Sequence, residues 1–220
     1  MQYLYRGDGG ALNLKLEGDD FRYIVKARRH RVEESIAIRN LEDDNIYFYK
    51  IENITKRAVT LQLIEQRELI VESKGVLNIG WCIIEPKVIE KTLPSINEMG
   101  VNSITFIYCK RSQKNFKLDL NRLKKILINS SQQCGRSSLM ELNIIDNLEQ
   151  FLKIYPDAKM LNFSKNIIKS DIKNIVVGCE GGFSSDEVSL FRDSDIVGFQ
   201  TPLTLRSQSA VCGVVSRILL

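Results

Sequence analysis

The 220-residue sequence has few of the residues from which metal sites and disulfide frameworks are built. It contains one histidine, His30, and no two cysteines are spaced as C-x-x-C. A zinc site of Cys and His ligands is therefore not expected, and the odd number of cysteines argues against a disulfide framework. We expect no metal and a reducing setting. The cysteines are Cys82, Cys109, Cys134, Cys179 and Cys212.

Long hydrophobic runs are also missing. No apolar run approaches the roughly 18 residues that cross a membrane, and the first ten residues, MQYLYRGDGG, contain no apolar leader segment. We therefore expect a cytoplasmic protein without a membrane partner. The hydrophobic content of 44% is enough to build the core of one or two domains.

Positive charge is distributed unevenly. The net charge is +4, yet residues 73–136 hold 11 Lys and Arg against four Asp and Glu. A second basic cluster lies within the otherwise balanced first third of the chain. Such clusters are typical of proteins that bind a phosphate backbone, although ordinary solvated faces would give the same pattern. The members of the second cluster are Arg22, Lys26, Arg28, Arg29 and Arg31.

The pattern of residues 1–72 predicts a small β-rich domain. Residues 46–54 and 58–66 alternate in polarity and are rich in β-branched and aromatic residues, with a turn over 55–57. SIAIRN before them predicts a third strand, so a small barrel or sandwich is expected. The VESKG segment near Glu72 is interpreted as a linker. We therefore place one domain at 1–72 and a second at 73–220.

Strands and helices alternate beyond residue 75. This alternation predicts an α/β domain with a mostly parallel sheet that is covered on both faces. The expected helices cover 88–100, where Pro94 kinks the helix or sets its start, and 119–134, which is amphipathic. The expected strands are 76–84, 103–109, ELNII, AKMLNF, NIVVG and DIVGF.

The stretch VVGCEGGFSSDEV, from Val176 to Val188, predicts a buried strand, a glycine loop and a short helix. Ser184 and Glu187 have the spacing of a capping box, so the helix should open at Ser184. Gly181 and Gly182 allow positive φ and a close approach of a ligand to the backbone.

The glycine loop fits neither a Walker A nor a Rossmann pattern, because no Gly-Lys-Ser/Thr follows and the glycine spacing differs. The next strand runs into a similar loop, QTPLTLRSQSAV. Two such loops at the carboxyl ends of neighbouring parallel strands would form a ligand crevice.

Several segments together resemble one family. VVGCEGGFSSDEV resembles the Gly-Pro-Glu-Gly-Gly-Phe-Ser loop of the 16S ribosomal RNA uracil-N3 methyltransferases, which belong to the SPOUT superfamily. LRSQSAV resembles the Leu-Arg-Thr-Glu-Thr-Ala segment of that family. INEMGV, KRSQ and SSQQCGR are similar to further family blocks, and RRHRVEESIAI is a looser match. The matches follow the family's order along nearly the whole chain.

The resemblance implies an N-terminal PUA-like RNA-binding barrel and a C-terminal SPOUT domain with a deep trefoil knot. It also implies S-adenosylmethionine as cofactor, small-subunit ribosomal RNA as substrate, and a homodimer whose active site lies at the subunit interface. The cofactor is expected to be bound by three loops. Their residues are Asn162, Phe163, Gly178, Glu180, Gly181, Gly182, Phe183, Thr201, Leu203 and Leu205.

Arginines suit the chemistry that the resemblance implies. Methylation of uracil N3 requires loss of its proton, and charge then spreads onto O2 and O4, where forked cationic donors stabilise it. The catalytic candidates are Arg111, Arg136 and Arg206, for which surface or interface salt bridges are the alternative. Glu180 is interpreted as a strut of the cofactor loop rather than a base. Cys179 is interpreted as a small loop residue, since a nucleophile would need a nearby base.

The sequence departs from the family at four places, which leaves two other functions open. Cys179 stands for a proline, Gln200-Thr201 for Leu-Gly, Gln208 for a glutamate and Ser95 for a lysine. The loss of charge at Gln208 is compatible with an RNA-binding homologue of weakened activity. A SPOUT enzyme acting on another RNA, such as tRNA, is the other alternative.

Overall fold

The structure is a computed structural model that describes residues 3–220. Contacts between Cα atoms divide the chain into two compact units. Unit 1 holds the chain up to Glu72 together with Ser131–Leu139, and unit 2 holds Ser73–Ser130 and Met140–Leu220. Residues 131–139, which the sequence analysis places in the second domain, thus cluster with the first.

Unit 1 is built on a five-stranded sheet in the order β1-β3-β4-β5-β2. β1 pairs with β3 in parallel, and the remaining neighbours are antiparallel. The β4–β5 hairpin turns at the predicted place, because Thr55 Oγ1 accepts the backbone N–H groups of Arg57 and Ala58. The strands are β1 (Leu4–Tyr5), β2 (Asn13–Glu17), β3 (Ser35–Arg39), β4 (Asn45–Ile54) and β5 (Ala58–Glu68).

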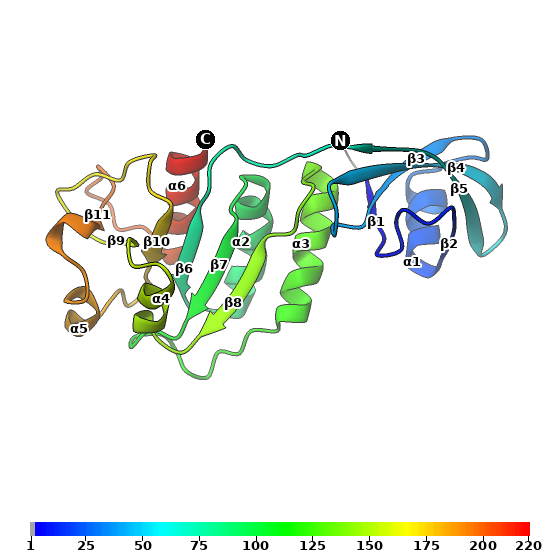
Figure 1. The fold of residues 1–220 in the computed structure, drawn as a ribbon. Coiled ribbons are helices and arrows are strands. Elements are labelled where there is room, and N and C mark those ends of the chain that lie inside the picture. Colours follow the sequence, from blue (N-terminus) through cyan, green and yellow to red (C-terminus); the bar gives the residue numbers. More distant parts are fainter. Residues whose placement is uncertain (1–2) are drawn as a thin grey trace. The chain divides into compact units, whose positions relative to one another are not determined.

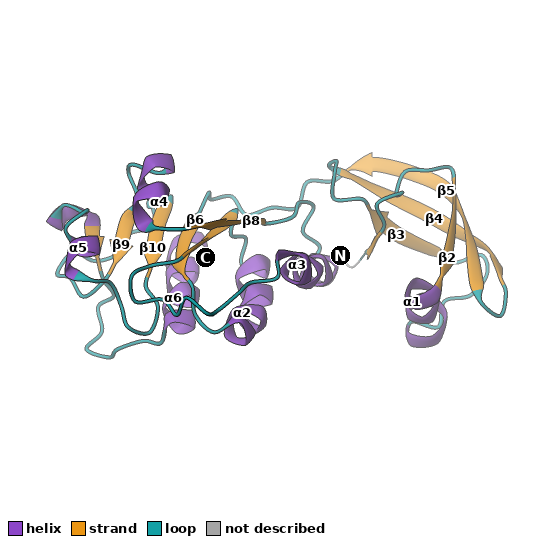
Figure 2. Cartoon of the chain, turned by 90° about the horizontal axis from the view of Figure 1, so that it is seen from below, coloured by secondary structure: helices purple, strands orange, loops and turns teal. Residues whose placement is uncertain are grey.

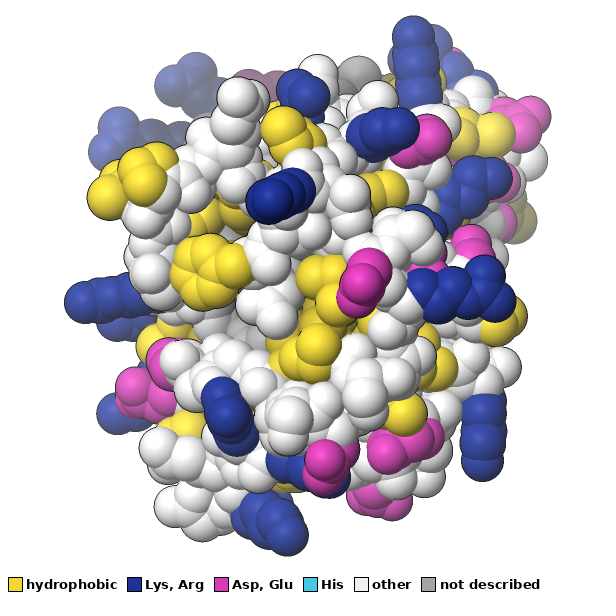
Figure 3. Space-filling view, turned by 90° about the vertical axis from the view of Figure 1, so that its left-hand side faces the viewer, with side chains coloured by type: hydrophobic (Ala, Val, Ile, Leu, Met, Phe, Trp, Pro, Cys, Tyr) yellow, Lys and Arg dark blue, Asp and Glu magenta, His cyan; other side chains and the backbone are white. Residues whose placement is uncertain are grey.

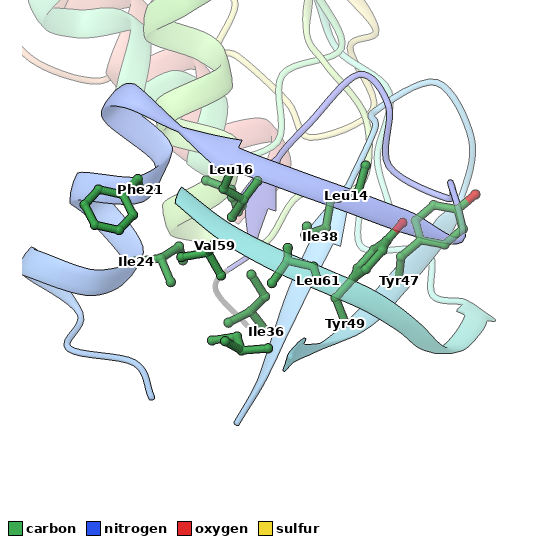
Figure 4. Packing of buried hydrophobic residues seen from close by; sticks show 12 residues of the cluster. Leu14, Leu16, Phe21, Ile24, Ile36, Ile38, Tyr47, Tyr49, Val59 and Leu61 are labelled. Atoms are coloured by element: carbon green, nitrogen blue, oxygen red, sulfur yellow. The ribbon is translucent and has the colours of Figure 1, made fainter. Parts of the chain in front are cut away.

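The core of unit 1 collects the inward side chains of these strands and of one helix (Figure 4). In β2, Leu14 and Leu16 are buried between exposed neighbours, which is the alternation expected of a strand with one buried face. Helix α1 (Gly18–Phe21) continues into a π-helical turn (Arg22–Ala27), and it contributes Phe21 and Ile24 to the core. The sequence analysis did not predict this helix; Arg22 and Lys26 of the basic cluster lie on its π-helical turn and the other three members follow it.

Unit 2 contains a six-stranded, wholly parallel sheet in the order β11-β9-β10-β6-β7-β8 (Figure 1). The predicted α/β architecture is therefore confirmed. The central strands β10, β6 and β7 are buried nearly throughout, as their continuous apolar sequences predict. The strands are β6 (Asn78–Cys82), β7 (Ser103–Ile107), β8 (Glu141–Ile145), β9 (Lys159–Leu161), β10 (Asn174–Val177) and β11 (Ile196–Val197).

Helices lie on both faces of this sheet. α2 and α6 cover one face and α4 lies on the other (Figure 2). α2 begins at Pro86 and passes through Pro94, so Pro94 neither starts nor ends it. The helices are α2 (Pro86–Glu98), α3 (Leu120–Cys134), α4 (Leu148–Ile154), α5 (Ser185–Val188) and α6 (Ser207–Leu219), with a 3-10 turn at Asp193–Asp195.

The odd number of cysteines argues against a disulfide framework, yet the structure contains one disulfide among the described residues. Cys82, the last residue of β6, is bonded to Cys109, which follows β7. Adjacent parallel strands bring the two Cα atoms to 5.6 Å, within the range that a disulfide requires. Sequence spacing could not show this pairing. Within residues 3–220, no helix has the length and apolar character needed to span a membrane.

Candidate functional site

Unit 2 contains a cavity of about 630 Å³ where three neighbouring strands end. The loops that follow β9, β10 and β11 line it, together with the start of α6. These strands are parallel and adjacent, so their carboxyl ends meet at one edge of the sheet, where open α/β sheets bind ligands. Figure 3 shows the side of unit 2 that carries these loops, with hydrophobic side chains gathered in a central hollow.

The cavity brings together all ten residues predicted to bind the cofactor. β9 lies between β10 and β11 in the sheet. The loop after β9, which carries Asn162 and Phe163, therefore lines the cavity beside the other two loops. Arg111 and Arg206, two of the three catalytic candidates, also line the cavity. Residues that the sequence analysis did not select complete the wall. They include Leu161, Ser164, Val177, Cys179, Phe199, Thr204, Ser207 and Ala210.

The glycine loop is tight, and its glycines differ in their roles. Gly182 has a φ of 66° and closes a turn in which its N–H donates to the carbonyl of Cys179 at 2.9 Å. Gly181 does not have positive φ, so of the two sequence-based reasons for a glycine there, the need for positive φ is wrong. A Cβ at Gly181 would instead lie 3.3 Å from Cβ of Arg111. Glycine at 181 therefore makes room for the Arg111 side chain.

The predicted capping box is confirmed at the start of α5. Ser184 Oγ accepts the N–H of Glu187, and Glu187 Oε2 accepts the N–H of Ser184 at 2.8 Å. This arrangement satisfies two N–H groups that the helix end would otherwise leave unpaired. The short helix thereby fixes where the glycine loop ends.

A chain of two hydrogen bonds also anchors the first residue of the glycine loop, Gly178. Ser207 Oγ, at the start of α6, donates to the carbonyl of Gly178 at 2.5 Å and accepts from Nε1 of Trp81 at 2.9 Å. Ser207 was not selected from the sequence. Its position in the family-like segment LRSQSAV could have identified it as a site residue, but its partners, Trp81 and Gly178, become visible only in the fold.

Arg111 and Arg206 reach the cavity in different ways. Arg111 is exposed, and its Nη1 donates to the carbonyl of Gly181 at 2.7 Å. Arg206 is exposed and immediately precedes α6. Glu180 is exposed at the rim, in agreement with a loop position. The cavity therefore combines backbone polar groups and apolar walls with two guanidinium groups at its edge.

Arg136 does not belong to the cavity wall that residues 3–220 form. It lies in unit 1 and is only 7% exposed. Its Nε donates to Ser138 Oγ, and its carbonyl accepts from the hydroxyl of Tyr3 at 2.7 Å. Burial lowers the pKa of the guanidinium, opposed by the charge of Glu72. Arg136 therefore belongs to unit 1, whereas Arg111 and Arg206 line the cavity of unit 2.

Cys179 is a buried member of the glycine loop. Burial raises the pKa of its thiol, so the protonated form is favoured at neutral pH. Reactive cysteines have a lowered pKa and a nearby cation or base. Its environment therefore agrees with a small loop residue.

The basic cluster of unit 1 is exposed. All five of its Lys and Arg side chains face solvent on or after α1. Arg22 pairs with Asp19, and the Arg28 guanidinium lies 5.3 Å from the ring centroid of Tyr23. His30 is held by Glu34 at 2.8 Å. The surface offers five exposed cations, of which Arg28 lies over an aromatic ring, a combination that suits nucleic acid.

Two family models match the chain. The model described as "RNA methyltransferase domain" matches residues 71–219, and the one described as "RNA methyltransferase PUA domain" matches residues 16–64. The first covers unit 2 with its cavity. The second covers most of the sheet of unit 1 and the basic cluster.

Two relatives that align with most of this chain share the same name. The "Ribosomal RNA small subunit methyltransferase E" of Helicobacter pylori is 36% identical over 222 residues, with 98% of each chain covered. Its namesake from Aquifex aeolicus is 25% identical over 203 residues, covering 86% of this chain and 87% of the relative.

Solved structures share the fold. The Neisseria gonorrhoeae "Ribosomal RNA small subunit methyltransferase E", bound to S-adenosylmethionine, superposes with a TM-score of 0.78 at 18% identity, covering 98% of this chain and 95% of that one. A Legionella pneumophila protein in complex with the same cofactor gives 0.79 at 23% identity, covering 98% and 94%.

Proposed function

We propose that this chain, which belongs to the ribosomal RNA small subunit methyltransferase E family, methylates N3 of a uridine in 16S ribosomal RNA with S-adenosylmethionine as methyl donor. The observation that carries the proposal is the cavity at the ends of β9, β10 and β11. The three loops predicted to bind the cofactor meet there, and two of them, VVGCEGGFSSDEV and LRSQSAV, resemble segments of the family.

The residues of the cavity suit the cofactor. A volume of about 630 Å³ lies within the range of small-molecule sites, which are mostly apolar with a few placed polar groups. The turn at Gly182 and the absence of a side chain at Gly181 leave backbone groups accessible. Leu161, Leu203 and Leu205 would supply apolar contacts. S-adenosylmethionine, when bound, supplies an electrophilic methyl group on its sulfonium.

The chain's own contribution to transfer is to bind the nucleotide and stabilise charge. Uracil N3 must lose its proton, and the negative charge then spreads onto O2 and O4. Arg111 and Arg206 stand at the cavity edge and present forked cationic donors, so we assign them to the uracil or its phosphates. A target base within folded RNA must first be unstacked, which costs roughly a few kcal/mol.

We further propose that residues 1–72 form a PUA-like domain that binds RNA through the basic cluster and that residues 73–220 form a SPOUT domain with a trefoil knot. The resemblance to the family supports this division, together with the half-barrel sheet of unit 1 and the parallel sheet of unit 2. We also propose a cytoplasmic homodimer.

The test combines cofactor binding with mapping of the product. Calorimetry should detect S-adenosylmethionine binding to the purified chain. A deletion strain should lack one N3-methyluridine in 16S ribosomal RNA, and the chain should restore it. Restoration of a modification in tRNA instead would show that another RNA is the substrate.

One departure from the family motivates a second candidate, an RNA-binding homologue without transfer. Gln208 stands where the family has a glutamate, and it lies half-buried on α6. Tight RNA binding with no S-adenosylmethionine binding would favour this candidate.

A further inference from the structure

Glu187 makes a hydrogen bond that the capping box does not explain. The capping box uses one carboxylate oxygen, Oε2. The other oxygen, Oε1, accepts the backbone N–H of Lys110 at 2.7 Å, across 77 residues of sequence. The side chain is 3% exposed. A buried carboxylate thus bridges two loops through two backbone donors.

The loop that Glu187 holds is the one that carries Arg111. Lys110 and Arg111 follow β7, and Arg111 donates to the carbonyl of Gly181 in the glycine loop. The Lys110 side chain pairs with Asp186, but this ion pair is exposed and therefore contributes little to the stability of the loop. On the other side, the disulfide fixes Cys109 to the end of β6. The chain just before Arg111 is therefore held by a covalent bond at Cys109 and by a buried charge-assisted hydrogen bond at the N–H of Lys110.

We propose that Glu187 is a positioning residue that aligns Arg111 with the cofactor cavity. By binding the N–H of Lys110 and the N–H of Ser184 at once, it fixes the Arg111 loop and the glycine loop in one geometry. A misplacement of about 1 Å at a reacting centre can cost roughly 10²-fold in rate. The proposal rests on the proposed function, since it assigns the residue a role in methyl transfer.

The experiment replaces Glu187→Gln, which keeps the shape but turns one acceptor oxygen into an NH₂ donor. One of the two backbone N–H groups then loses its acceptor. We expect faster amide hydrogen exchange at Lys110 or Ser184 and a fall in kcat of at least about tenfold. Glu187→Asp, which retains the charge but is shorter, should give a smaller change of the same kind.

A double-mutant cycle separates positioning from folding. In an Arg111→Ala background, Glu187→Gln should lower kcat by a smaller factor than in the unaltered chain, because the part of its effect that acts through Arg111 is gone. Two variants serve as matched controls on the same helix. Asp186→Asn removes only the exposed pair, and Ser184→Ala weakens the cap without touching the bond to Lys110. Asp186→Asn should leave kcat within about twofold, and Ser184→Ala should lower the melting temperature while leaving amide exchange at Lys110 unchanged.

Equal losses of kcat in both Arg111 backgrounds would overturn the proposal, as would unchanged exchange at both amides in Glu187→Gln. Absence of methyl transfer by the unaltered chain would instead refute the proposed function. Amide exchange would in that case still decide whether Glu187 holds the Arg111 loop, since it does not depend on the reaction.

Discussion

The indole N–H of Trp81 donates to Ser207 Oγ at 2.9 Å, and the same hydroxyl donates to the carbonyl of Gly178. Trp81 lies on the central strand β6, and Ser207 begins α6. The pair therefore connects the most buried part of the sheet to the first residue of the glycine loop. A single hydroxyl serves as acceptor for one group and as donor to the other.

Ser207→Ala should weaken both stability and cofactor binding. The variant leaves the buried indole N–H of Trp81 without an acceptor, which costs about 1–3 kcal/mol of unfolding free energy. It also releases the Gly178 carbonyl, so S-adenosylmethionine affinity measured by calorimetry should fall. Ser207→Thr retains the hydroxyl and should restore both. If Trp81→Phe abolishes the stability loss caused by Ser207→Ala, the hydrogen bond is its source.

Gly181→Val should mainly lower the affinity for S-adenosylmethionine, whereas Gly182→Ala should mainly lower the stability of the fold. A side chain at Gly181 meets Arg111 and the cavity, whereas the backbone there is not strained, so affinity should fall at least about tenfold with little loss of stability. At Gly182 a Cβ meets nothing within 4 Å, but φ is positive. Alanine there should cost about 1–2 kcal/mol of stability. Full S-adenosylmethionine affinity in folded Gly181→Val protein would contradict the placement of the cofactor.

Reversal of Arg28 and Arg29 to glutamate should weaken RNA binding and flatten its salt dependence. Removing a cation that neutralises one phosphate lowers the slope of log K against log salt by roughly one unit. Reversal of Lys56 and Arg57, which are exposed in the β4–β5 turn of the same unit, is the matched control. Equal slopes for the two variants would show that the basic cluster contributes only general charge.

Arg136→Lys should lower the rate of methylation at least about tenfold if the guanidinium grips the nucleotide, because lysine cannot reproduce its fork. The sequence alone predicts almost no change in melting temperature. The burial of Arg136 revises this expectation, so a drop in melting temperature should accompany the change. Both quantities must therefore be measured. A less stable protein with the rate of the unaltered chain would make Arg136 purely structural.

Local sequence patterns predict most of the helices and strands of the chain. The apolar runs of β6, β7 and β10 predict buried strands, and Ser184 with Glu187 predicts the start of α5 because a capping box depends only on residues three apart. The helix at Gly18–Phe21 was missed, since it is short and its sequence is largely polar. Its helical state depends on the burial of Phe21 and Ile24 against the sheet.

The sequence by itself determined the α/β alternation, the glycine loop and the basic cluster, because each of these features depends only on residues that are close together in the chain. Only the tertiary structure decided which distant residues meet. β9 lies between β10 and β11, Cys82 reaches Cys109, and Glu187 reaches the N–H of Lys110. Each of these depends on strand order, which brings together residues whose spacing in the sequence carries no periodic signal.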